Sequence, residues 1–434
     1  MLVRAIGRWP LTAIVVNSVI GSGIFGLPAA LAGLAGAWSP LTVLLAGASI
    51  FVVVLCFAEV GSRFDESGGP YLYAREAFGP AAAFQVGWLH LWTRILSAAA
   101  VINVLVAYLS AIVPWAGTPA GRAIAMTAGV GIATAVNVRG VRQAAWSVNA
   151  FTIAKLVPLV AVILLGAFHF RREVLVSQAV PQPDWTGAVL LLVFAYGGFE
   201  SAIVAAAESR DPRRDTAFAL VTAMLSITAI YCLMQLVVVG VLPDAKSHPA
   251  PIVATLRELV GAPGAAIGAL AVVVSVYGWL LGFVLTTPRI LFAMAERREM
   301  PAVFARVHPR FRTPHVAIIV TASVGLALGL SSGFTQLAIF SAISRLAIYA
   351  STCAALIALR KQRGMPAGFR APGGVATAVA GIAFCLWLLS TRNLAQAWFL
   401  PVVLLAGGLV WLFMRSRQPG DVVNDAHNPR TGLR

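Results

Sequence analysis

Long apolar segments separated by short polar connections follow one another along nearly the whole chain. A helix needs about 20 predominantly apolar residues to cross a bilayer, and the pattern predicts twelve such spans. Their predicted limits are 10–36, 40–62, 84–113, 121–138, 147–168, 186–207, 216–242, 263–288, 315–331, 335–359, 373–390 and 394–415.

These segments favour helices over a barrel. Every backbone N–H must find a partner inside the hydrocarbon, which leaves only helices or a closed barrel. Barrel strands alternate polar and apolar positions, whereas a run such as 161–167 (Ala-Val-Ile-Leu-Leu-Gly-Ala) is apolar throughout. We therefore predict an all-α membrane protein with twelve transmembrane helices.

Composition agrees with this prediction, because 59% of the 434 residues are hydrophobic and only 11% are charged. Soluble domains carry about 25% charged residues. A net charge of +16 suggests a nucleic-acid partner at first sight, but the placement of the charges explains it otherwise. With a cytoplasmic N-terminus, 23 of the 32 Lys and Arg residues fall in predicted cytoplasmic segments and 6 in external ones. This bias follows the positive-inside rule, so we predict a multi-pass inner-membrane protein with both termini cytoplasmic and no nucleic-acid partner.

The first predicted span is interrupted at its middle by Gly21-Ser22-Gly23-Ile24-Phe25. Each glycine disfavours a helix by about 1 kcal/mol relative to alanine, and Pro28 suits the first turn of a new helix. The sixth span contains a second candidate break at Tyr196-Gly197-Gly198, followed by Glu200. Close packing of neighbouring helices is the alternative explanation for such glycines. Two breaks in corresponding places instead favour a binding site, because broken helices expose backbone donors and acceptors at membrane depth.

At these residues the chain resembles the amino acid–polyamine–organocation transporter superfamily. The similarity begins with Gly21–Phe25 and continues in order through four further motifs. These are Ser67-Gly-Gly-Pro-Tyr-Leu-Tyr73, Phe199-Glu-Ser201, Asp211-Pro-Arg-Arg214 and Arg289-Ile-Leu-Phe-Ala-Met-Ala295, the last with Pro301 and His308-Pro309 after it.

The resemblance implies two inverted five-helix repeats, at 10–168 and 186–359, with discontinuous first and sixth helices. Two extra helices at 373–415 and a disordered cytoplasmic tail at 418–434 complete a single transporter domain. It also implies amino acids or related amines as substrates. We predict that they are moved by proton-coupled symport or, alternatively, by exchange.

The predicted substrate site lies at the two breaks. We expect the backbone of Gly21, Ser22 and Gly23 to hold the substrate carboxylate, because a helix N-terminus attracts anions. Carbonyl groups near Val19 and Ile20, and near Phe194 and Ala195, are expected to hold the amine. The other predicted lining residues are Ile24, Tyr196, Gly197, Glu200, Ser275 and Tyr277. Ala195 and Gly197 leave space for an uncharged or apolar side chain.

Ionisable residues inside predicted spans are functional candidates, because a charge at mid-bilayer is costly. Lys155 matches the fifth-helix lysine that replaces sodium in family members without a sodium requirement, so we predict a proton-coupling role or a fixed charge. Snorkelling of Lys155 to the interface is the alternative. Glu200 either contacts a substrate amine, gates the external side, or pairs with Arg94 or Arg345. Those two arginines either pair or hold an anionic substrate group, and Glu59 is either structural or gating.

Enzyme chemistry finds no support in the sequence. The six histidines and the cysteines at 56, 232, 353 and 385 show no metal-ligand spacing, so we expect no metal, no cofactor and no catalytic residues. A channel or a sensor on the same fold remains the alternative to a transporter.

Overall fold

The computed structural model describes residues 7–64, 68–140, 158–200, 209, 211–362, 366–392, 396 and 398–417. Helices make up nearly all of this part of the chain. The labelled α-helices are α1 (Arg8–Val19), α2 (Ser22–Ala35), α3 (Ser39–Gly61), α4 (Gly69–Phe78), α5 (Pro80–Ser110), α6 (Pro119–Arg139), α8 (Arg172–Ser177), α9 (Trp185–Ala195), α11 (Pro212–Val241), α12 (Pro251–Glu296), α13 (His315–Ser331), α14 (Phe334–Lys361), α15 (Val375–Ser390) and α17 (Phe399–Ser416). Single 3₁₀ turns are η1 (Gly36–Trp38), η2 (Pro114–Gly117), η3 (Ala245–Ser247) and η4 (Ala302–Ala305).

Seven helical stretches among the described residues are long and apolar enough to cross a membrane, and four shorter apolar helices accompany them. Each of the twelve predicted segments overlaps a described helix. The number of membrane crossings and the five-plus-five repeat stay predictions. Lys155 and the tail 418–434 lie outside the described residues.

The first predicted break is present. α1 ends at Val19 and α2 begins at Ser22, and Ile20 between them has a non-helical φ/ψ of −68°/85°. Pro28 lies inside α2, where a membrane helix tolerates it better than a soluble one does.

The second predicted break is also present. α9 ends at Ala195, and residues 196–198 form a turn before the chain resumes helical geometry at Phe199 and Glu200. Gly198 has a φ of +123°, a conformation that side-chain-bearing residues rarely adopt. The backbone conformation itself therefore requires glycine at position 198.

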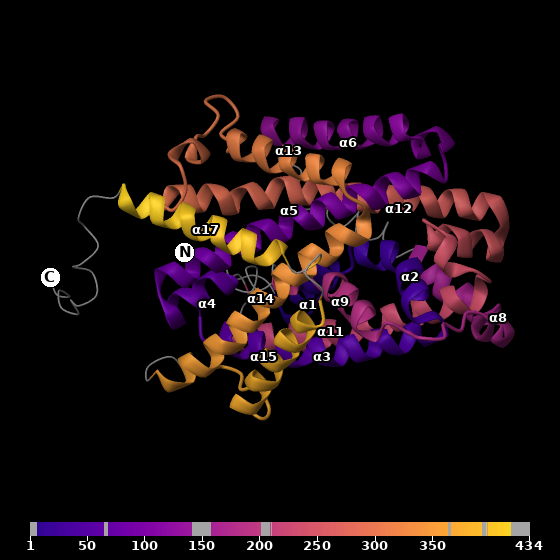
Figure 1. Ribbon diagram of the computed structural model, residues 1–434, viewed down its shortest axis with the longest axis horizontal. Helices are drawn as coiled ribbons and strands as arrows, with labels where there is room; N and C mark the ends of the chain where they lie inside the picture. Colours follow the sequence, from indigo (N-terminus) through magenta and orange to yellow (C-terminus); the bar gives the residue numbers. More distant parts are fainter. Residues whose placement is uncertain are drawn as a thin grey trace.

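The broken helices lie at the centre of the molecule. Figure 1 shows α6 and α13 along one edge, α3 and α15 along the opposite edge, and α1, α2 and α9 between them. α5 packs along α12 and α14, α11 packs along α1 and α3, and α2 packs along α9. The two half-helix pairs are thus held by α3, α5, α11 and α14.

Two features of the helices were not expected from the apolar pattern. α4 is a separate ten-residue helix between the second and third predicted spans. α12 runs over 46 residues but bends at Gly261, where φ is +74°, so the predicted span 263–288 covers only its second part.

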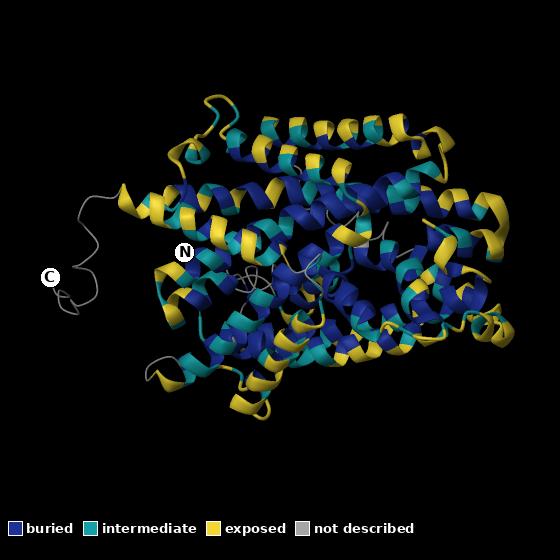
Figure 2. Cartoon of the chain, viewed as in Figure 1, coloured by how far each residue is buried: buried dark blue, intermediate teal, exposed yellow. Residues whose placement is uncertain are grey.

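Burial separates a packed interior from an apolar outer surface. Figure 2 shows buried residues concentrated at the centre of the bundle and exposed residues along the outer faces of α6 and α17. Many of these exposed residues are large and apolar, including Leu405, Leu409 and Phe413 on α17. Apolar side chains pointing outward suit hydrocarbon as the surrounding solvent.

Candidate functional site

The two helix breaks touch each other. A Cβ atom on Gly23 would lie 2.6 Å from the Cα atom of Ala195, and a Cβ atom on Gly198 would lie 2.4 Å from the carbonyl oxygen of Ser18. Real Cβ atoms essentially never approach other atoms this closely. Glycine at both positions is therefore what allows the backbones of the two broken helices to meet.

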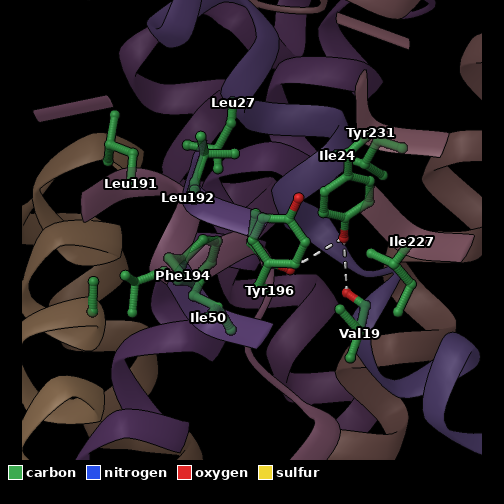
Figure 3. Close-up of a cluster of buried hydrophobic side chains, with 14 of the residues drawn as sticks. Val19, Ile24, Leu27, Ile50, Leu191, Leu192, Phe194, Tyr196, Ile227 and Tyr231 are labelled. Carbon is green, nitrogen blue, oxygen red and sulfur yellow. Dashed lines mark hydrogen bonds between the residues drawn. The ribbon is translucent and has the colours of Figure 1, made fainter. Parts of the chain in front are cut away.

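One tyrosine of α11 joins the two helix ends. The Tyr231 hydroxyl lies 3.1 Å from the carbonyl oxygen of Val19 and 3.1 Å from that of Ala195, as the dashed lines in Figure 3 show. These are the last residues of α1 and α9, whose carbonyl groups lack a partner within the helix. A buried phenol thus supplies a donor where both helices stop.

Glu200 occupies the positive end of the second break. Its carboxylate accepts a hydrogen bond from the backbone N–H of Gly198 at 2.9 Å and forms an ion pair with Arg345 of α14. The side chains of Glu200 and Arg345 are only 4% and 5% exposed. A Cβ atom on Gly197 would collide with the Arg345 guanidinium, so this glycine makes room for the pair. Of the two predicted partners of Glu200, Arg345 is the one in contact.

A large cavity adjoins the breaks on the α1 side. Its volume is about 740 Å³, and its walls come from α1, α4, α5 and α12. It reaches the breaks at Asn17, Ser18 and Glu200. The other lining residues are Gly68, Pro70, Tyr71, Gly87, His90, Arg94, Ser275, Gly278, Trp279, Gly282, Phe283, Thr286, Arg289, Ile290, Ala293, Met294 and Arg297.

Gly21 lies directly behind this wall. A Cβ atom on Gly21 would be 3.3 Å from Nε1 of Trp279, whose side chain lines the cavity. The start of α2 therefore adjoins the inner end of the cavity. No side chain of a described residue caps this helix start by a hydrogen bond.

The predicted site residues divide into two groups. Glu200, Ser275 and Arg94 line the large cavity. Gly23, Ile24 and Ala195 instead line a gap of only about 20 Å³ beyond the contact between the breaks. Ser22 is the first residue of α2, and Ile20 is fully buried at the break.

Three further predicted residues point elsewhere. The Phe194 ring lies edge-on to Phe334, with ring centroids 5.9 Å apart. The Tyr196 hydroxyl donates to the carbonyl of Val43 at 3.1 Å. The Tyr277 hydroxyl is directed to the carbonyl of Gly129 on α6 at 3.4 Å. The space that the small residues suggested is filled by packing, and the open volume lies toward α5 and α12.

Glu59 belongs to a separate buried network near the end of α3. Arg360 of α14 donates to both of its carboxylate oxygens at 2.7 and 2.5 Å, and Arg63 donates at 2.9 Å. The backbone N–H of Ala371 adds a fourth hydrogen bond at 2.8 Å. This network ties α3 to α14 and to the segment before α15 at one end of the bundle.

A second polar contact lies beside the cavity mouth. The Tyr71 hydroxyl of α4 donates to the Glu299 carboxylate at 2.6 Å, and the Arg297 guanidinium stands over the Tyr71 ring. Burial raises the pKa of Glu299 above its ordinary value, against the opposing influence of Tyr71, Arg297 and Arg75. The contact joins α4 to the loop after α12.

Most residues of the cavity wall were not among the predicted site residues. The lining positions on α12 include 275, 279, 282, 286, 290, 293 and 297, which recur every three or four residues and so share one helix face. Gly87, His90 and Arg94 follow the same spacing on α5. Polar and glycine residues at this spacing within otherwise apolar spans were the signal that could have located the cavity.

A comparison with known protein families identifies the family of this chain. The family model described as amino acid permease matches residues 6–419. The chain belongs to the amino acid permease family. This membership agrees with the resemblance read from the motifs, and it makes the chain a multi-pass membrane protein of a transporter family.

Several curated bacterial relatives cover most of the chain. A serine/threonine exchanger of Bacillus subtilis is 28% identical over 83% of this chain and 84% of its own length. A methylthioribose transporter of the same organism is 26% identical over 96% of this chain and 94% of its own length. An arginine/agmatine antiporter of Chlamydia pneumoniae is 27% identical over 94% of this chain and 89% of its own length. All three are transporters, and their different substrates mean that family membership alone does not fix the substrate.

Proposed function

We propose that this protein is a secondary transporter that moves amino acids across the cytoplasmic membrane by alternating access. The observation that carries the proposal is the meeting of two broken helices at the inner end of a 740 Å³ cavity. Discontinuous helices facing each other at membrane depth are the usual substrate site of such transporters.

The two breaks differ in whether an anionic side chain already occupies them, and this difference supports the first break as the binding place of the substrate carboxylate. The second break already holds an anion, because Glu200 accepts the Gly198 N–H. The start of α2 has no side-chain cap among the described residues, so its backbone donors at Gly21–Gly23 are the ones we assign to a carboxylate. Tyr231 engages the carbonyls of Val19 and Ala195, so we assign the substrate amine to the carbonyls near Ile20 and Phe194.

The shape of the interior supports alternating access. The large cavity lies on one side of the Gly23–Ala195 contact, and a gap of about 20 Å³ lies on the other side. Arg289 and Arg297 of the cavity wall belong to segments that we predict to be cytoplasmic. With that orientation the cavity opens inward and the external side is closed.

For the mode of transport we propose proton-coupled symport, with Lys155 as the coupling group. Exchange is the second candidate, because two of the relatives are named as an exchanger and an antiporter. Both modes use the same substrate site, and they differ in whether a proton gradient alone drives accumulation.

Proteoliposome uptake tests the proposal. We expect the purified protein to accumulate at least one labelled amino acid from a panel against its concentration gradient when the lumen is alkaline. Lys155→Ala is expected to abolish the accumulation driven by the pH gradient and to leave one-for-one exchange measurable. Accumulation in wild type that ignores the pH gradient but needs a trapped amino acid would replace symport by exchange. Downhill equilibration alone, under either gradient, would contradict a coupled transporter and favour a channel.

A further inference from the structure

Arg94 is a half-buried guanidinium that faces the cavity from the middle of α5. Its Nε and Nη2 atoms donate to the hydroxyl groups of Thr287 and Thr286, at 3.3 and 3.0 Å. Its charge stands over the rings of Trp279 and Phe283, at 5.6 and 6.0 Å from their centroids. All four of these partners are uncharged, so they fix the position of Arg94, and no carboxylate of the described residues forms an ion pair with it.

Three other buried or partly buried arginines of the bundle do have a carboxylate partner. Arg345 is paired with Glu200, and Arg63 and Arg360 share Glu59. No carboxylate of a described residue lies within 4.0 Å of the Arg94 guanidinium. Arg94 is only partly removed from water, and an anion bound in the cavity beside it would stabilise its charge.

The other charged residues that line the cavity also favour an anionic ligand. Three arginines, at 94, 289 and 297, line it together with a single carboxylate, Glu200. That carboxylate is already engaged by Arg345 and by the Gly198 N–H. A positively charged substrate side chain would therefore meet three arginines and, among the described lining residues, no carboxylate that is free of a partner.

A second polar group lies beside Arg94. His90 lies one helical turn earlier on α5 and lines the cavity. Its Nδ1 atom is buried, and among the described residues it has no hydrogen-bond partner. Buried polar atoms are nearly always hydrogen-bonded, so His90 presents an unsatisfied polar atom on the face of α5 that also carries the Arg94 guanidinium.

We propose that the transported substrate is an amino acid with a second carboxylate, and that Arg94 binds this distal carboxylate. The inference rests on the proposed function, because the first carboxylate and the amine are the groups assigned to the helix breaks. The aromatic pair Trp279 and Phe283, stacked with centroids 6.0 Å apart, holds the guanidinium in place by its ring faces. It also excludes a cationic side chain from the same faces, because Arg94 already covers them.

Comparing each acidic amino acid with its neutral amide separates the effect of the side-chain charge on uptake from the effect of side-chain size. Purified protein in proteoliposomes is tested for uptake of labelled L-glutamate and L-aspartate against L-glutamine and L-asparagine, with L-arginine as the cationic probe. We expect each acid to be preferred over its amide by at least about tenfold, the usual effect of a hydrogen bond to a charged group, and arginine to be excluded.

Substitution of Arg94 then assigns the preference to this residue. Arg94→Gln is expected to lower the acid-to-amide ratio by about tenfold while glutamine uptake persists, which also shows that the variant is folded. Arg94→Lys is expected to keep part of the preference, because it keeps the charge but not the fork geometry. Arg257→Gln, which removes an exposed arginine of α12 outside the cavity, is the matched control and is expected to keep the wild-type ratio.

Two other outcomes would distinguish failure of the Arg94 assignment from failure of the proposed function. If wild type prefers the amides or arginine, or if Arg94→Gln keeps the acid preference, the assignment is overturned while amino acid transport stands. If none of a full amino acid panel is transported, the proposed function itself is overturned.

Discussion

Replacing Gly23 by leucine is expected to lower amino acid binding by at least about tenfold. Even a Cβ atom at this position would lie 2.6 Å from the Cα atom of Ala195, which is backbone and cannot swing aside. Overpacking in a well-packed interior costs about 1–3 kcal/mol, and here the larger side chain would push apart the two helix breaks that we propose as the substrate site. The measurement is the binding of a labelled amino acid to purified protein by scintillation proximity.

The matched control lies on the same helix. A Cβ atom on Gly33 would meet only Cβ of Lys246, at the ordinary contact distance of 3.7 Å. Gly33→Ala is therefore expected to bind with wild-type affinity and to unfold at the wild-type temperature. If Gly23→Leu bound as tightly as Gly33→Ala, the contact between the breaks would have no part in the substrate site.

Glu200→Gln is expected to destabilise the protein by about 3–5 kcal/mol, because it leaves the Arg345 guanidinium buried without its counter-ion. The two side chains are almost fully enclosed, so water cannot replace the lost partner. The substitution also replaces the carboxylate that accepts the Gly198 N–H at the second break by a neutral amide. A lowered unfolding temperature in detergent and a loss of transport are the expected readouts.

A double variant distinguishes the effect of an unpaired Arg345 charge from the effect of changing residue 200 itself. Glu200→Gln combined with Arg345→Met removes both charges and is expected to recover much of the stability, since no unpaired ion remains. Glu258→Gln, which changes an exposed carboxylate of α12, is expected to leave the unfolding temperature unchanged. A single variant Glu200→Gln as stable as wild type would show that the ion pair does not hold α14 against the second break.

The helix breaks were predictable because their cause is local. Gly21 and Gly23 weaken the helix where they stand, and the +123° φ of Gly198 needs a glycine. The apolar helices were predictable for a similar reason, since a helix that spans hydrocarbon needs its own run of apolar residues. A conformational requirement of this local kind can be recognised from the residue type at the position concerned.

The contacts of the site were not predictable in this way. Glu200 had two candidate partners, and only the fold brings Arg345, 145 residues away, into contact with it. The cavity was expected beside Ala195 and Gly197, but these residues pack against Gly23 and Arg345. Which small residue leaves open space and which one admits a neighbour depends on how helices from distant parts of the chain meet.

Protection of a cysteine at position 18 tests most directly whether the substrate binds where the cavity meets the helix breaks. Ser18 is half-buried at the inner end of the cavity. Ser18→Cys in a Cys232→Ser background would be labelled in detergent with a maleimide, with and without a transported amino acid. The other native cysteines are buried, and Ser416→Cys, on the exposed end of α17, is the control. We expect about tenfold slower labelling of Ser18→Cys at ten times the dissociation constant, with Ser416→Cys unaffected. Equal labelling rates of Ser18→Cys with and without a bound amino acid would contradict this expectation.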